Sequence, residues 1–114
     1  MNKYEDLKIW QKAMDLVELM KDMPADEIYG LTSQIKRCSI SIPSNIAEGA
    51  GRNSNKQFAH FLSIVNGSTT ELETQILLVQ RLKLCSENKI KPILDICIEV
   101  KKMNFSLQRS LNKE

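Results

Sequence analysis

The residues of this chain whose types and spacing suggest chemistry are few, and several stand together between α-helical patterns. Gly49 to Arg52 read Gly-Ala-Gly-Arg, and paired glycines of this kind occur in loops that bind phosphate. A dinucleotide fingerprint also needs a preceding strand and a third glycine, and a Walker A loop needs Gly-Lys followed by Ser or Thr. Ser54 stands where the third glycine would be. The sequence therefore favours helix ends over a nucleotide site.

Basic residues form the second candidate site. Arg52 and Lys56 are expected at the N-terminus of a helix, where free amides and the helix dipole attract anions. The other basic pairs lie within or at the end of predicted helices. Each residue fits a solvated helical surface, and each could instead neutralise a phosphate of RNA or DNA. The candidate nucleic-acid-binding residues are Lys36, Arg37, Arg52, Lys56, Arg81 and Lys83.

Two polar rows form the third candidate site. Both follow helical steps, so each row lies on one face of its helix. Gly67, four residues before the second row, would let another backbone approach closely. An interhelical hydrogen-bond network and simple surface exposure are both open. The first row is Gln34, Ser41, Asn45 and Glu48, and the second is Glu71 and Gln75.

The sequence gives little support for a catalytic site or a metal site. A di-iron bundle needs two Glu-x-x-His motifs, whereas His60 is the chain's one histidine. No nucleophile elbow is present, and Cys38 falls at a core position. Cys38, Cys85 and Cys97 each lie in an apolar periodic run, as expected of reduced, buried thiols in a cytoplasmic protein. We therefore expect no catalytic residue, no metal, no cofactor and no enzymatic activity.

The elements that must position these residues are helices. The chain has 114 residues, of which 42% are hydrophobic and 5% aromatic, and its net charge is +2. This composition suits a single domain over residues 1–114 built by helix packing. Apolar steps of three and four predict helices over about 6–23, from near 26 to 51, from 54 to about 85, and from between 86 and 92 onward. Asp6 is the expected first N-cap, and Ser54 with Gln57 fits a capping box.

Prolines and glycines interrupt these patterns. Pro24 is expected to end the first helix, and Pro92 to lie in the first turn of the fourth. The apolar phase of the second helix passes through Pro43, which predicts a kink rather than a break. The freed backbone groups are expected to be satisfied by Ser39, Ser41 and Ser44. Gly49 or Gly51 is expected to supply a left-handed C-cap.

Short connections predict an all-α, antiparallel, up-down-up-down four-helix bundle. The expected stripe of the first helix is Leu7, Trp10, Ala13, Met14, Val17 and Met20. No stretch is long and apolar enough to predict a signal peptide or a membrane span. Further apolar residues fall off the main stripes, which predicts a homo-oligomeric interface. They are Ile9, Leu16, Leu19, Ile40, Leu77, Leu78, Ile96 and Ile98.

A family resemblance covers about Tyr4 to Leu84. The segments YEDLKIWQKAMDLV and YGLTSQIKRCSISIPSNIAEGAGRNSNKQFAHFLSIVNGSTTELETQ resemble the four-helix-bundle proteins encoded in intervening sequences of bacterial 23S rRNA genes. The resemblance implies a bundle without enzymatic activity that assembles into a ring, typically a pentamer. A related branch comprises accessory proteins of diversity-generating retroelements, which bind a reverse transcriptase and nucleic acid through basic surfaces. The implied partners are therefore the chain itself, RNA or DNA, and a reverse transcriptase or ribosomal component.

Overall fold

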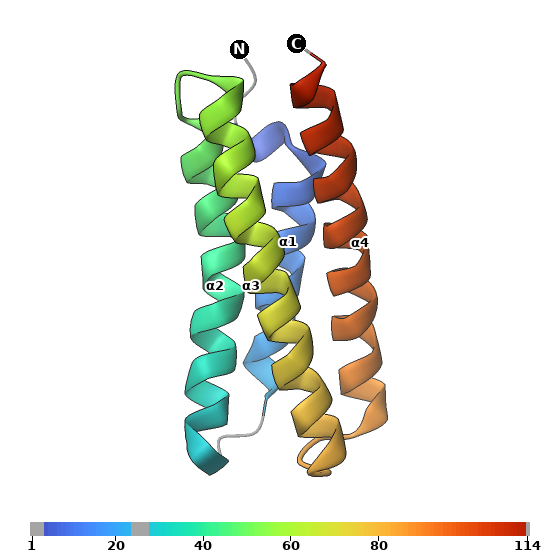
Figure 1. Cartoon of the computed structure of the whole chain (residues 1–114). Helices are drawn as coiled ribbons and strands as arrows, with labels where there is room; N and C mark the ends of the chain where they lie inside the picture. Colours follow the sequence, from blue (N-terminus) through green and yellow to red (C-terminus); the bar gives the residue numbers. More distant parts are fainter. Residues whose placement is uncertain (1–3, 24–27, 114) are drawn as a thin grey trace.

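Four α-helices make up the fold in a computed structural model that describes residues 4–23 and 28–113 (Figure 1). They are α1 (Lys8–Leu19), α2 (Leu31–Ala50), α3 (Asn55–Arg81) and α4 (Glu87–Asn112). Short 3-10 turns, η1 (Tyr4–Asp6), η2 (Met20–Asp22) and η3 (Ile28–Gly30), flank α1 and precede α2. No strand occurs among the described residues. The all-α four-helix prediction is therefore confirmed.

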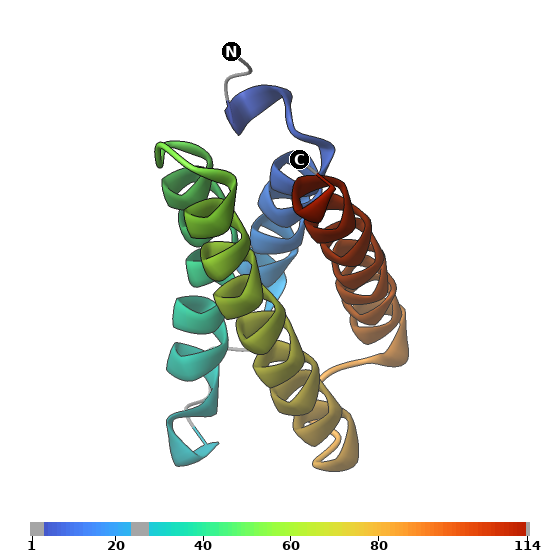
Figure 2. The same cartoon turned by 45° about the horizontal axis from the view of Figure 1, so that its top comes forward.

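The helices pack into a closed square. α2 packs against α3, α3 against α4, and α1 against both α2 and α4, as the tilted view in Figure 2 shows. The start of α1, the α2–α3 connection and the end of α4 lie at one end of the bundle, with the α3–α4 connection at the other (Figure 1). Within the described ranges, no helix is both long and apolar enough to cross a membrane.

The core is aliphatic, as the low aromatic content predicts. Every helix contributes fully buried side chains at steps of three and four, so each helix turns one continuous stripe inward. The largest are Leu16, Ile35, Ile42, Ile46, Leu62, Leu72, Ile76, Ile90, Ile93, Val65, Val79 and Val100. These stripes hold the outward-facing polar residues at defined positions around the square.

The predicted inner face of α1 needs correction. Ile9 and Leu16, which the sequence placed off the stripe, are 3% and 0% exposed, whereas Met14 is 41% exposed. Ala13 and Met20, which belong to the predicted stripe, are buried, at 0% and 3% exposed. The inner face is therefore rotated from the predicted one: it keeps Ala13 and Met20 and takes Ile9 and Leu16 in place of Met14. The N-cap is Leu7 rather than Asp6, which lies in η1. Pro24 lies outside the described residues.

α2 begins later than expected. Tyr29 and Gly30 have left-handed backbones, with φ of 58° and 68°, and such residues cannot continue a right-handed helix. The helix therefore starts at Leu31 rather than near Asp26, which lies outside the described residues.

From Leu31, α2 runs unbroken through Pro43, as the continuous apolar phase predicts. The Ser39 hydroxyl donates to the Lys36 carbonyl at 2.9 Å, and the Ser41 hydroxyl donates to the Cys38 carbonyl at 2.6 Å. Pro43 removes the donor for the Ser39 carbonyl, but neither hydroxyl bonds that carbonyl. The expected satisfaction of the freed backbone group by these serines is therefore not seen among the described residues. Bonds of this kind bend helices, and the kink itself stays a prediction.

The end of α3 and the place of Pro92 in α4 also differ from expectation. α3 ends at Arg81 rather than near Cys85, because Lys83 is left-handed with a φ of 57°. The Leu84 amide donates to the Val79 carbonyl and the Lys83 amide to the Gln80 carbonyl, both at 3.1 Å. This pair of bonds is a Schellman motif. α4 begins at Glu87, inside the predicted window, so Pro92 lies in the second turn and not the first.

Candidate nucleic-acid interface

The α2–α3 junction is built around Gly49. This glycine lies inside α2 and is buried, and a Cβ placed there would lie 2.6 Å from the Phe61 Cβ. Because glycine has no side chain, α3 can pack this closely against α2. Gly51 caps α2 with a right-handed φ of −81°. The predicted left-handed C-cap is therefore wrong, and Gly49 serves helix packing instead.

Ser54 starts α3, as predicted. Its side-chain oxygen accepts the Gln57 amide at 3.1 Å, with α3 beginning at Asn55. This bond satisfies one of the free amides that would otherwise point to solvent at the helix start. The cap fixes where Lys56 and His60 project from the first turns of α3.

Arg52, between the two helices, has partners within the chain. Its Nη2 lies 2.7 Å from the Glu48 Oε2, and its guanidinium carbon lies 4.9 Å from the centroid of the Phe61 ring. A phosphate binding here would compete with a carboxylate and a cation–π contact. Lys56 and His60 line the same open hollow and are exposed.

The other predicted cations lie elsewhere. Lys36 lines a groove between α1 and α2, whereas Arg37 lines a hollow between α2 and α3. Arg81 and Lys83 lie at the far end of α3. Lys56 and Arg81 are 25 residues apart on one helix, which places them about 37 Å apart along its axis. The six residues do not form one patch in a single chain.

The two polar rows make bonds along their own helices. The Asn45 side-chain amide donates to the Ser41 carbonyl at 2.8 Å, and that of Gln75 donates to the Glu71 carboxylate at 3.4 Å. Gln34, Ser41 and Glu71 do meet in the hollow between α2 and α3, beside Arg37. The Gln75 Oε1 is buried and has no hydrogen-bond partner among the described residues.

Glu48, the last member of the first row, pairs with Arg52. Gly67 faces open space: apart from its own helix backbone and its chain neighbours, no atom of the described residues lies within 4 Å of a Cβ placed there. The close approach expected at Gly67 is therefore not made within one chain.

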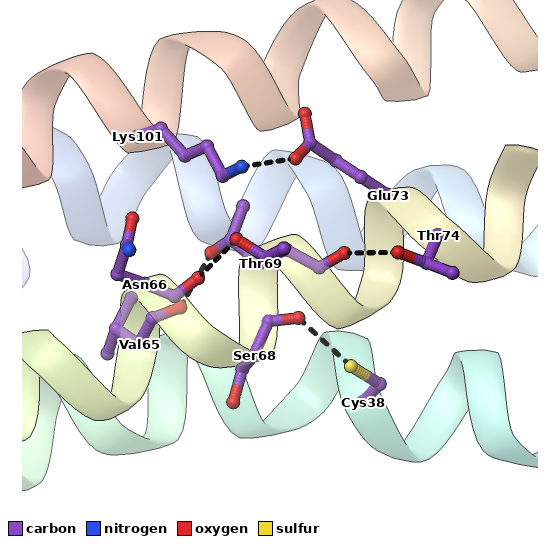
Figure 3. A network of polar contacts seen from close by, with 9 residues as sticks. Cys38, Val65, Asn66, Ser68, Thr69, Glu73, Thr74 and Lys101 are labelled. Carbon is purple, nitrogen blue, oxygen red and sulfur yellow. Dashed lines mark hydrogen bonds and ion pairs between the residues drawn. The ribbon is translucent and has the colours of Figure 1, made fainter.

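Contacts between helices come from other residues. The Cys38 thiol donates to the Ser68 carbonyl at 3.2 Å, and Lys101 of α4 pairs with Glu73 of α3 (Figure 3). The side-chain amide of Asn104, which is 1% exposed, donates to the Leu62 carbonyl at 2.8 Å. The signal for Asn104 was its position in the apolar stripe of α4, since a polar residue there must find a buried partner.

The cysteines behave as buried thiols. Burial raises the pKa of Cys38 to about 11 and that of Cys97 to about 12, so both stay protonated at neutral pH and are poor nucleophiles and metal ligands. Cys85 is half-buried. In residues 4–23 and 28–113, no cluster of three or more His, Cys, Asp or Glu side chains could hold a metal ion.

Comparison with known proteins places the chain in a family. None of the curated proteins with which it was compared matches it. The model of one family, described as 23S rRNA-intervening sequence protein, matches residues 5–106. This span includes all of α1, α2 and α3 and most of α4, and it contains every candidate residue named above. The chain therefore belongs to the family of 23S rRNA-intervening sequence proteins.

Proposed function

We propose that this protein is a non-enzymatic, homo-oligomeric bundle that associates with RNA or a ribonucleoprotein in the cytoplasm. The observation that carries the proposal is the state of the predicted cations. All six are exposed, and five of them form no ion pair within the described part of the chain: Lys36, Arg37, Lys56, Arg81 and Lys83. An unpaired cation can neutralise a phosphate and release its counterions without first breaking a salt bridge.

Oligomerisation is part of this proposal because the cations are dispersed. A single chain presents them at separate places along a bundle 46 Å long, and each contact alone is weak. A symmetric oligomer repeats every cation around its axis, so contacts with one RNA add up through effective concentration. The ring, and a pentamer as its size, follow from the family resemblance.

Exposed apolar side chains support self-association. Ile40, Leu77, Leu78 and Ile98, four of the residues predicted to lie off the main stripes, are 45% to 53% exposed. Leu19 and Ile96 are half-buried, and Ile9 and Leu16 belong to the core. Large apolar side chains on this many helices exceed what a small monomer usually leaves in water.

An antiparallel arrangement of the helices is the form proposed for each subunit. The late residue Gly49 of α2 lies near the early residue Phe61 of α3. The earlier residue Cys38 bonds the later residue Ser68. Position along α3 rises as position along α2 falls, which supports the up-down order.

The test is fluorescence anisotropy with structured RNA and with single-stranded DNA over a salt series. Wild type should bind more tightly at low salt, and the five-site variant K36Q/R37Q/K56Q/R81Q/K83Q should lose most of this salt dependence. A matched control, K12Q/K91Q/K101Q, removes cations that are already paired with Glu99, Asp95 and Glu73. Absence of binding by wild type at low salt would contradict the proposal.

A protein–protein adaptor, such as an accessory protein of a reverse transcriptase, is the second candidate. The observation that favours it is an open hollow of about 710 Å³ along the first half of α4, in which Ile90, Leu94 and Ile98 lie among polar side chains and Gln80 of α3 forms one border. Pull-down from the native host distinguishes the two candidates. Recovery of one protein after nuclease treatment favours the adaptor, and recovery of RNA favours the first candidate.

A further inference from the structure

An outward stripe on α4 combines apolar and basic side chains. Ile98, Lys102, Phe105 and Arg109 follow one another at steps of four, three and four, so they lie on one face of the helix. Ile98 is 46% exposed and Phe105 is 61% exposed. The Arg109 guanidinium carbon lies 5.7 Å from the centroid of the Phe105 ring. Neither Lys102 nor Arg109 forms an ion pair with any described residue.

An outward stripe on α1 and η2 has the same spacing and the opposite charge. Gln11, Asp15, Glu18 and Asp22 also follow at steps of four, three and four, and all four are exposed. Their three carboxylates have no ion-pair partner in the described ranges. Met14, which is 41% exposed, lies beside Asp15.

The two stripes match in length as well as in charge. Lys102 and Arg109 are seven residues apart, as are Asp15 and Asp22. The first pair spans about 10.5 Å along α4, and the second about 12 Å, because its last three residues lie in the 3-10 turn η2. An antiparallel docking would set Lys102 opposite Asp22 and Arg109 opposite Asp15. In this register the Phe105 ring would lie at the level of Glu18 and Leu19, and Leu19 is half-buried, so part of its aliphatic side chain is available to the ring.

We propose that the α4 stripe of one chain docks on the α1 stripe of a second copy. This inference rests on the homo-oligomerisation proposed above and names the surfaces that carry it. The stripes of one chain do not meet each other, because α1 and α4 pack through other residues, such as the Lys12–Glu99 ion pair at 2.9 Å. Both stripes therefore remain free for other molecules.

The contact joins two different surfaces, so it is heterologous. After each docking, every chain still presents one unused stripe, and the assembly grows until it closes as a ring or extends as a filament. This property separates the pairing from a two-fold dimer, which would use one surface twice. It also fits the need for repeated cations around an axis.

The test reverses the charge of one stripe in each of two variants and asks whether mixing the two variants restores assembly. K102E/R109E makes both stripes acidic, and D15K/D22K makes both stripes basic. Light scattering coupled to size exclusion should show that each variant alone loses assembly, with a dissociation constant raised about tenfold or more. Mixed at equal concentration, the two variants should associate again in alternation, which also shows that both are folded. Because a ring with an odd number of subunits cannot alternate, the expected result is the return of mixed complexes larger than 13.0 kDa, not of a closed pentamer. The control K89E reverses an exposed lysine off the stripe and should assemble like wild type.

The remaining outcomes would contradict different parts of the proposal. A wild type that stays at 13.0 kDa at all concentrations and salts would reject homo-oligomerisation and this pairing with it. Assembly of either reversed variant at the wild-type level would reject the pairing alone. Loss of RNA binding by K102E/R109E with assembly intact would assign the α4 stripe to nucleic acid and overturn the inference.

Discussion

The N-terminal and C-terminal ends of α3 differ in how the helix is terminated and in whether the nearby cations are paired. At its N-terminal end, Ser54 caps the helix, Gly49 admits Phe61, and Arg52 is paired with Glu48. At its C-terminal end, Lys83 adopts a left-handed backbone without being glycine, and neither it nor Arg81 forms an ion pair with a described residue. The first junction is shaped for close packing. The second carries backbone strain and exposes unneutralised charge, which is the state that phosphate binding requires.

Among substitutions at the two ends of α3, that of Gly49 should change the free energy of unfolding most. In Gly49→Ala the new Cβ would lie 2.6 Å from a Cβ of α3, and neither atom can rotate away. We expect a loss of about 1–3 kcal/mol in the free energy of unfolding, measured by urea denaturation. Gly51→Ala is the control, because its Cβ would make only ordinary contacts at 3.5 Å. It should be neutral or stabilising, and equal losses in the two variants would contradict the packing role of Gly49.

Removal of the Ser54 cap should have the next largest effect. Ser54→Ala deletes the acceptor for the Gln57 amide and should cost about 1 kcal/mol. Ser86 is a matched control, because it is the N-cap of α4 and makes no side-chain capping bond. If Ser86→Ala costs as much as Ser54→Ala in the same denaturation experiment, the capping bond is not the cause.

Relief of strain at Lys83 should act in the opposite direction. Lys83→Gly removes the steric cost of a left-handed non-glycine residue and should raise the free energy of unfolding by up to about 1 kcal/mol. Lys83→Ala keeps the Cβ and should leave stability unchanged. A gain of equal size in both variants would indicate an effect of charge rather than of backbone conformation.

The ion pair of Arg52 should contribute least to stability. Arg52→Gln removes an exposed pair one turn apart, and such pairs contribute about 0.3–0.5 kcal/mol. Arg81→Gln should change the free energy of unfolding by less than Arg52→Gln does, because Arg81 has no ion pair in the described residues. Thermal denaturation of both variants measures the difference. Addition of 1 M salt should reduce the difference between the two variants, because salt screens the ion pair with Glu48 but leaves the contact of Arg52 with the Phe61 ring. A difference that salt leaves unchanged would contradict a contribution from the ion pair.

Features that depend on local periodicity could be predicted from the sequence. Features that depend on which of several neighbouring residues packs inward, or on an unusual backbone conformation, could not. Four helices, the Ser54 cap and passage through Pro43 all follow from spacing and residue type. The inner face of α1 did not follow, because two sets of apolar residues obey the same helical steps and only packing chooses between them. The end of α3 was missed because its left-handed residue is lysine, where the usual signal is glycine.

For the candidate site, the sequence identified the cations but not their pairing. Glu48 stands four residues before Arg52, so their ion pair follows from local spacing, whereas the contact of Arg52 with the Phe61 ring depends on packing between helices. Contacts such as Asn104 to Leu62 join residues 42 positions apart, and no local pattern specifies such a pair. Local spacing and packing between helices together decide which cations stay unpaired.

The salt dependence of RNA binding tests this account most directly. Anisotropy with one single-stranded RNA should be measured over a salt series for wild type, Arg52→Gln and R81Q/K83Q. The account predicts that R81Q/K83Q lowers the slope of log affinity against log salt by about 0.7 for each lost phosphate contact, whereas Arg52→Gln leaves the slope unchanged. A slope that falls for Arg52→Gln and stays constant for R81Q/K83Q would contradict it.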